Sequence, residues 1–169
     1  RDEIDKAVND AFGDVDDVVR LMFVACHPSL SADRRVALTL KTVAGFSVGQ
    51  ISSALLAQPT AVAQRLVRAK KQIRELGLSF EAPRSELPRR LDSVLQVIYL
   101  LFNEGYSAHE GSDPIRGELC EEAVRLANLI CTSERWDFGR QPRVHALLAL
   151  MLLQSARLRE KNVCGVIVG

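Results

Sequence analysis

Two breaks within residues 31–76 limit the possible folds more than any other feature of the sequence. The first break is Gly45-Phe46-Ser47 and the second is Gln58-Pro59-Thr60. Glycine and proline are the strongest local signals for turns and helix ends. The breaks separate three segments that are compatible with helices: 33–44, 47–56 and 60–76. We therefore predict three short helices joined by tight turns.

Two local patterns support this prediction. Ser47 is followed three residues later by Gln50, which predicts a capping box in which each side chain satisfies a free backbone amide at the helix start. In segment 60–76, apolar residues recur at spacings of four and three, which places them on one stripe of a helix. These residues are Val62, Leu66, Ala69, Ile73 and Leu76.

The face beside this stripe has the properties of a DNA-reading surface. It carries short side chains near the N-terminus and basic ones beyond them: Ala61, Gln64, Arg65, Arg68, Lys71 and Gln72. A helix with this layout can enter the major groove, where its first turns read base edges and its later cations meet phosphates. We therefore predict that segments 47–56 and 60–76 form a helix-turn-helix.

Charge supports a polyanionic partner. From Arg34 to Leu76, eight basic residues stand against Glu75 alone, a local net charge of +7, whereas the whole chain carries only +1. Pattern and charge together favour DNA binding over a solvated basic face, although Arg34 and Arg35 fit either interpretation. The candidate DNA-binding residues are Arg34, Arg35, Lys41, Ser47, Thr60, Ala61, Gln64, Arg65, Arg68 and Lys71.

The remaining sequence predicts further helices. Hydrophobic residues make up 47% of the chain but aromatic residues only 5%, which favours an all-α fold packed through aliphatic side chains. Before the helix-turn-helix, residues 1–20 carry an excess of acidic side chains. Their pattern predicts an amphipathic helix broken near Gly13. A helix over 14–26 should end before His27-Pro28, and Ser31 is a suitable N-cap for the next helix.

The chain divides into two predicted domains. Residues 1–78 form the first, with its helix-turn-helix core at 31–76, and a proline-containing linker spans 79–90. Residues 91–169 form a helical, tetratricopeptide-like domain without a visible fixed-period repeat. Its expected helices are 87–105, 117–131 and 142–160. The last is apolar on nearly every side over 144–153, so we expect it to be the most buried helix. The β-branched tail 162–169 predicts a short strand or an extended segment.

Several classes of function lack support in the sequence. The loop 104–115 contains His109, Glu110 and Asp113, but no nucleophile elbow, phosphate loop or metal-binding motif accompanies them. The four cysteines show no Cys-x-x-Cys spacing and are expected to be buried thiols. Nothing resembles a signal peptide or a membrane span. We predict no catalytic residue, metal, cofactor or small-molecule substrate, and a cytoplasmic location without membrane contact.

Two runs resemble one known family. The first covers Ala37-Leu38-Thr39-Leu40, Gly45-Phe46-Ser47, Ile51 and Val62-Ala63-Gln64-Arg65-Leu66-Val67-Arg68-Ala69-Lys70. It resembles region 4 of bacterial sigma factors of the extracytoplasmic-function type. The second run resembles the C-terminal extension of one subgroup of these factors: Tyr99-Leu100-Leu101-Phe102-Asn103-Glu104-Gly105-Tyr106 and Arg116-Gly117-Glu118-Leu119-Cys120.

The resemblance implies a function in transcription initiation. Region 4 of such factors binds the −35 promoter element and the flap of the RNA polymerase β subunit. The resemblance places Gln64, Arg65 and Arg68 at DNA-facing positions, and Ala61 stands where a hydroxyl residue is common. The sequence lacks an initiator methionine and a segment like the −10-reading region, so we expect a fragment. Two alternatives stay open: a stand-alone helix-turn-helix regulator, which would usually dimerise, and a helical protein–protein adaptor.

Overall fold

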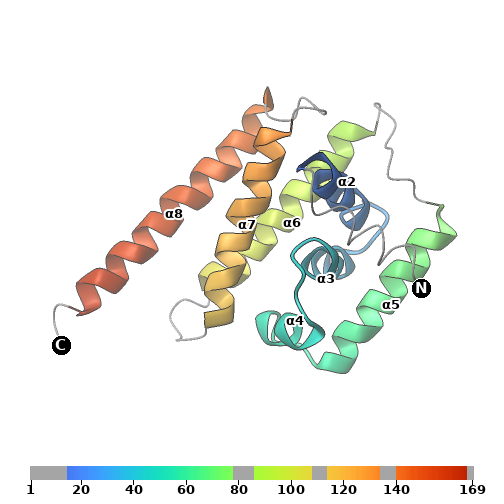
Figure 1. Cartoon of the computed structure of the whole chain (residues 1–169), viewed down its shortest axis with the longest axis horizontal. Helices are drawn as coiled ribbons and strands as arrows, with labels where there is room; N and C mark the ends of the chain where they lie inside the picture. The colour runs from blue at the N-terminus through green and yellow to red at the C-terminus, as the bar shows by residue number, and fades with distance from the viewer. Residues whose placement is uncertain (1–14, 78–85, 108–113, 134–139, 167–169) are drawn as a thin grey trace.

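In the part of the chain that the structure describes, the segments with apolar residues at helical spacing are helices. The computed structural model describes residues 15–77, 86–107, 114–133 and 140–166, and all regular structure in these ranges is helical (Figure 1). The helices are α2 (Val15–Ala25), α3 (Ala32–Thr42), α4 (Val48–Ala54), α5 (Pro59–Glu75), α6 (Leu87–Ser107), α7 (Pro114–Thr132) and α8 (Pro142–Val166). The all-α prediction is confirmed. The helix expected before Gly13 lies outside the described residues.

The predicted helix-turn-helix is present as α4 and α5, with α3 packed against both. The capping box at the start of α4 is formed as expected. The backbone N–H of Gln50 donates to Ser47 Oγ at 3.2 Å, and the N–H of Ser47 donates to Gln50 Oε1 at 2.9 Å. Ser31 occupies the N-cap position of α3, but its side chain makes no capping hydrogen bond. Pro59 begins α5, where its missing N–H would lack a helical partner in any case.

The turn between α4 and α5 contains a leucine in the left-handed region. Leu56 has a φ of +48°, and its side chain is 78% exposed. The N–H of Ala57 donates to the carbonyl of Ser52 at 2.9 Å, and the N–H of Leu56 to that of Ser53 at 3.3 Å. This pair of bonds is the Schellman arrangement, which usually has glycine at the left-handed position. The turn therefore sets the direction of α5 relative to α4. The left-handed backbone of Leu56 adds some conformational strain.

The C-terminal helices form a layer in which α7 lies between α6 and α8 (Figure 1). The prediction that the last helix is the most buried was wrong. Val144 and Met151 of α8 are fully buried, whereas Leu152 and Leu153 are 51% and 68% exposed. Among the described helices, α8 has neighbours on one side alone, so its apolar composition could not determine its burial. Helix α3 is buried along more than half of its 11 residues, and the buried residues are Val36, Ala37, Leu38, Thr39, Leu40 and Thr42.

The β-branched tail also differs from expectation. We predicted a strand or an extended segment for 162–169, but α8 continues as a helix to Val166. A strand needs a neighbouring strand to satisfy its backbone groups, whereas a helix pairs those groups within its own segment. The described ranges offer no strand with which this tail pairs, so helix is the conformation that leaves fewer backbone groups unpaired.

The hydrophobic core is continuous between the two halves of the chain. Buried Leu40 of α3 and Ile98 of α6 belong to one cluster of buried side chains. Helix α6 packs against α2 and α3, and α7 packs against α2 and α4. Of the linker predicted at 79–90, residues 79–85 lie outside the description, and the last four form the start of α6. The division into two domains stays a prediction.

The one-sided burial of α8 leads to a test with matched substitutions. Met151→Asp places a charge where the side chain is fully buried, and should lower the free energy of unfolding by several kcal/mol. Leu153→Asp places the same charge on the exposed side, and should change it by no more than about 0.5 kcal/mol. Urea denaturation followed by circular dichroism measures both. Equal losses would show that the outer face of α8 is buried in solution.

Candidate nucleic-acid interface

Helix α5 has a buried face and an outward face. Val62, Leu66 and Ala69 are buried against the neighbouring helices, as the apolar stripe predicted, and Ile73 is partly buried. Leu76, the last residue expected on the stripe, lies after the end of α5 and is 49% exposed. The opposite, outward face is formed by exposed residues of the middle of the helix: Gln64, Val67, Arg68 and Lys71. We call these four residues the outward face of α5.

The charges of this region suit contact with phosphates. Arg68, Lys71 and Arg74 are exposed to solvent. The only acidic residue of α5 is Glu75, whose carboxylate lies 3.6 Å from Lys71 Nζ. An exposed pair between residues one turn apart is worth at most about 0.5 kcal/mol, so Lys71 can exchange it for a phosphate. The outward face therefore combines a polar side chain, an aliphatic one and cations.

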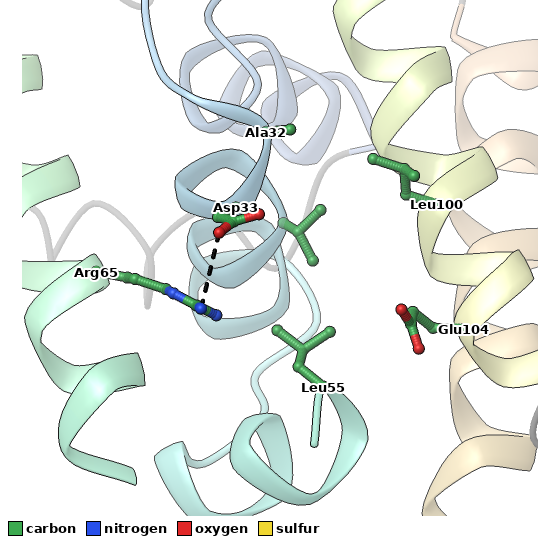
Figure 2. Close-up of a pocket in the computed structure, with 7 residues that line it drawn as sticks. Ala32, Asp33, Leu55, Arg65, Leu100 and Glu104 are labelled. Carbon is green, nitrogen blue, oxygen red and sulfur yellow. Dashed lines mark ion pairs between the residues drawn. The ribbon is translucent and has the colours of Figure 1, made fainter. Parts of the chain in front are cut away.

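Arg65 occupies a different position from its neighbours. Its guanidinium NH2 lies 3.7 Å from Asp33 Oδ2 of α3, and its side chain is 34% exposed. Figure 2 shows Arg65 reaching from α5 toward Asp33, with Leu100 and Glu104 of α6 across the pocket. This pocket has a volume of about 240 Å³ and is lined by α3, the end of α4, α5 and α6. Arg65 thus lies on the flank of α5, and must leave Asp33 before it can reach a base.

A second polar link ties the flank of α5 to the segment before α3. Arg34 NH1 donates to Gln72 Oε1 at 2.7 Å, and Gln72 Nε2 donates to the carbonyl of Ser29 at 2.9 Å. Arg34 is therefore engaged within the protein. Arg35 is half-buried, and its Nε has no hydrogen-bond partner within the described residues. The sequence did not single out Asp33 as a partner of Arg65, or Gln72 as a bridge, because both contacts join distant segments.

The remaining predicted residues are distributed around α5. Thr60 is exposed in the first turn of α5, and Ala61 beside it is half-buried. Lys41 is exposed in the last turn of α3. The hydroxyl of Ser47 accepts the capping hydrogen bond described above, so it already has a structural role at the start of α4. The outward face contains three of the residues predicted from the sequence, Gln64, Arg68 and Lys71. It also contains Val67, which the sequence did not single out.

The surroundings of Cys26, Cys120 and His27 indicate a structural role for these side chains. Cys26 Sγ lies 3.3 Å from Thr39 Oγ1, and burial raises the pKa of Cys26 to about 12. Burial likewise raises the pKa of Cys120 to about 11. Both thiols stay protonated at neutral pH, which confirms the expectation of buried thiols for these two. Burial lowers the pKa of His27, whose Nδ1 accepts from the N–H of Ser29 at 3.2 Å. Cys26 and His27 therefore serve the packing at the end of α2, whereas Cys120 of α7 donates to the carbonyl of Phe102 in α6 at 3.6 Å. Cys131 differs from the expectation, because it is only partly buried.

Two other kinds of site are absent from the described residues. No described helix is long and apolar enough to cross a membrane. Within the same residues, no cluster of three or more His, Cys, Asp or Glu side chains is arranged to hold a metal ion. His109, Glu110 and Asp113, which were considered for an enzyme site, lie outside the described residues.

Comparisons with known proteins match the two halves separately. Residues 20–73 match the family described as Sigma-70, region 4. Residues 90–168 match a family of unknown function (DUF6596). An uncharacterized protein of Rhizobium meliloti (strain 1021) is 42% identical over 147 residues, which is 86% of this chain and 34% of the relative. The chain thus spans about one third of the length of that relative. No solved structure matches.

These matches agree with the geometry of the helix-turn-helix. The region 4 match contains α3, α4 and nearly all of α5, including the complete outward face. The match at 90–168 contains most of α6 together with α7 and α8. A region 4 indicates a sigma-factor-like DNA-binding role in transcription. Residues 20–73 of the chain are therefore similar to a sigma-70 region 4, and they are joined to helices that match a family of unknown function.

Proposed function

We propose that this chain binds the −35 element of promoters through the outward face of α5, and recruits RNA polymerase as part of a sigma factor of the extracytoplasmic-function type. The observation that carries the proposal is the position of the region 4 match over an exposed, cationic recognition helix. Gln64 and Arg68 would meet base edges, while Lys71 and Arg74 would meet phosphates. The second partner would be the flap of the polymerase β subunit, and the complex would act in the cytoplasm.

The arrangement of the helices is compatible with this function. Helix α5 packs on α3 and α4, whereas α6 packs on α2 and α3, and α8 lies farthest from α5 (Figure 1). The outward face remains exposed in the presence of the C-terminal helices. A duplex could therefore approach α5 without displacing the extension. This geometry supports a protein in which the DNA and the C-terminal extension lie on different sides of the same helical core.

The proposal limits how tightly the chain binds alone. One short helix supplies the base contacts, and single modules of this kind gain little over non-specific electrostatic binding. We expect weak binding by the chain by itself and loss of most affinity at physiological salt, with no opening of the duplex. In a complete sigma factor, polymerase and a −10-reading region would raise the effective concentration of region 4 at the promoter.

Salt dependence tests the proposed phosphate contacts. Fluorescence anisotropy with a labelled duplex at several salt concentrations gives the slope of log affinity against log salt. Each phosphate contact contributes about −0.9 to this slope, so Lys71→Ala should make the slope shallower by about 0.9. Arg157→Ala, which removes an exposed cation from α8, is the matched control and should leave the slope unchanged. Nanomolar binding that is insensitive to salt would contradict the proposal, and would favour a stand-alone regulator.

Arg65 and Asp33 provide a second test, because Asp33 and DNA would compete for the guanidinium of Arg65. Arg65→Ala should weaken binding to a selected site more than to random duplex, by about 1–3 kcal/mol of discrimination if Arg65 contacts a base. Asp33→Asn frees Arg65 and removes a pair worth at most about 1 kcal/mol, so it should raise affinity by no more than about fivefold. Both are measured by the same titration. Equal losses on both duplexes for Arg65→Ala would assign Arg65 to phosphate contact.

A further inference from the structure

Val67 is an exposed aliphatic residue in the middle of a polar helix face. Its side chain is 67% exposed, whereas Val62 and Leu66 of the same helix are buried. Its exposed neighbours at spacings of three and four are Ala63 at i−4, which has a single methyl group, Gln64 at i−3 and Lys71 at i+4, and Arg68 follows it directly. No described helix packs over this part of α5, since all of these residues remain exposed. Val67 is therefore available for contact with a partner.

We propose that Val67 contacts the methyl group of a thymine in the bound duplex, and so selects a T·A pair at one position. The inference rests on the proposed function, because it requires α5 to lie in the major groove. The thymine C5-methyl is the apolar feature that base pairs present in that groove. Gln64, Arg68 and Lys71 can donate hydrogen bonds or neutralise phosphates, but none of them matches a methyl group. Val67 is the outward-face residue whose chemistry does.

The side chain of Val67 is suited to reading a fixed position. Valine in a helix strongly prefers one χ1 rotamer, so its two methyl groups have defined directions before binding. Little rotamer freedom is lost when they meet a thymine. The cations around Val67 favour DNA over an apolar protein surface as the partner, because a protein partner would have to desolvate Arg68 and Lys71 without phosphates to pair them. Valine at this position therefore selects a base by its shape, while the neighbouring cations hold the phosphates.

Deoxyuridine provides a probe that removes only the methyl group. A randomised duplex pool is first enriched on the complete chain, and each thymine of the enriched site is then replaced singly by deoxyuridine. We expect one replacement to weaken binding of the unmodified protein about fourfold, the factor that corresponds to burial of one methyl-sized group. Val67→Ala should weaken binding to the thymine duplex by a similar factor, and should bind the thymine and deoxyuridine duplexes equally.

Leu153→Ala is the matched control, since it shortens an equally exposed aliphatic side chain on α8. It should keep both the affinity and the sensitivity to deoxyuridine of the unmodified protein. An enriched site that tolerates deoxyuridine at every position, or that contains no thymine, would overturn the inference and leave the proposed function intact. The inference also fails if Val67→Ala keeps the full sensitivity to deoxyuridine. A pool enriched at low salt, where the chain is expected to bind DNA, that shows no sequence preference would overturn the proposed function and the inference together.

Discussion

The burial of α3 is the constraint on which the rest of the structure depends. This helix contacts α2, α4, α5 and α6, and Ala37 and Leu40 are completely enclosed. Interiors of proteins are close-packed, so a helix with neighbours on several sides transmits any change in its position to all of them. The recognition helix lies on one side of α3, and the C-terminal helices lie on another. The position of α5 is therefore set by the same core that holds the extension.

Polar contacts refine the position that this hydrophobic packing sets. Arg34, Gln72 and the carbonyl of Ser29 form a chain of two hydrogen bonds between the start of α3 and the last turns of α5. Arg65 of α5 and Asp33 of α3 form a second link, which lies nearer to α6. Surface ion pairs contribute about 0–1 kcal/mol each, far less than the burial of the apolar stripe of α5. The stripe therefore holds α5 in place and sets the rotation that presents Gln64, Val67 and Arg68 outward, and the polar links add to this packing.

The sequence predicted the local features well because local signals determine them. The glycine and proline breaks located α3, α4 and α5, and the Ser47–Gln50 pair predicted a capping box that the structure contains. Failures occurred where the outcome depends on distant segments. The apolar composition of α8 did not reveal that only one of its sides has neighbours, and nothing near Arg65 in sequence identifies Asp33. Val67 was missed because helical spacing identifies stripes, whereas a single exposed aliphatic residue forms none.

The central claim is that the outward face of α5 is the surface that meets DNA. Photo-cross-linking tests it most directly, with a photoreactive amino acid placed at Gln64 or, for comparison, at Leu153 on α8. Both positions are exposed, but they belong to helices on opposite sides of the molecule (Figure 1). Irradiation with labelled duplex should link DNA to position 64, in a reaction that unlabelled duplex suppresses, and should leave position 153 unlinked. Equal linking at both positions, or linking at 153 alone, would contradict the account.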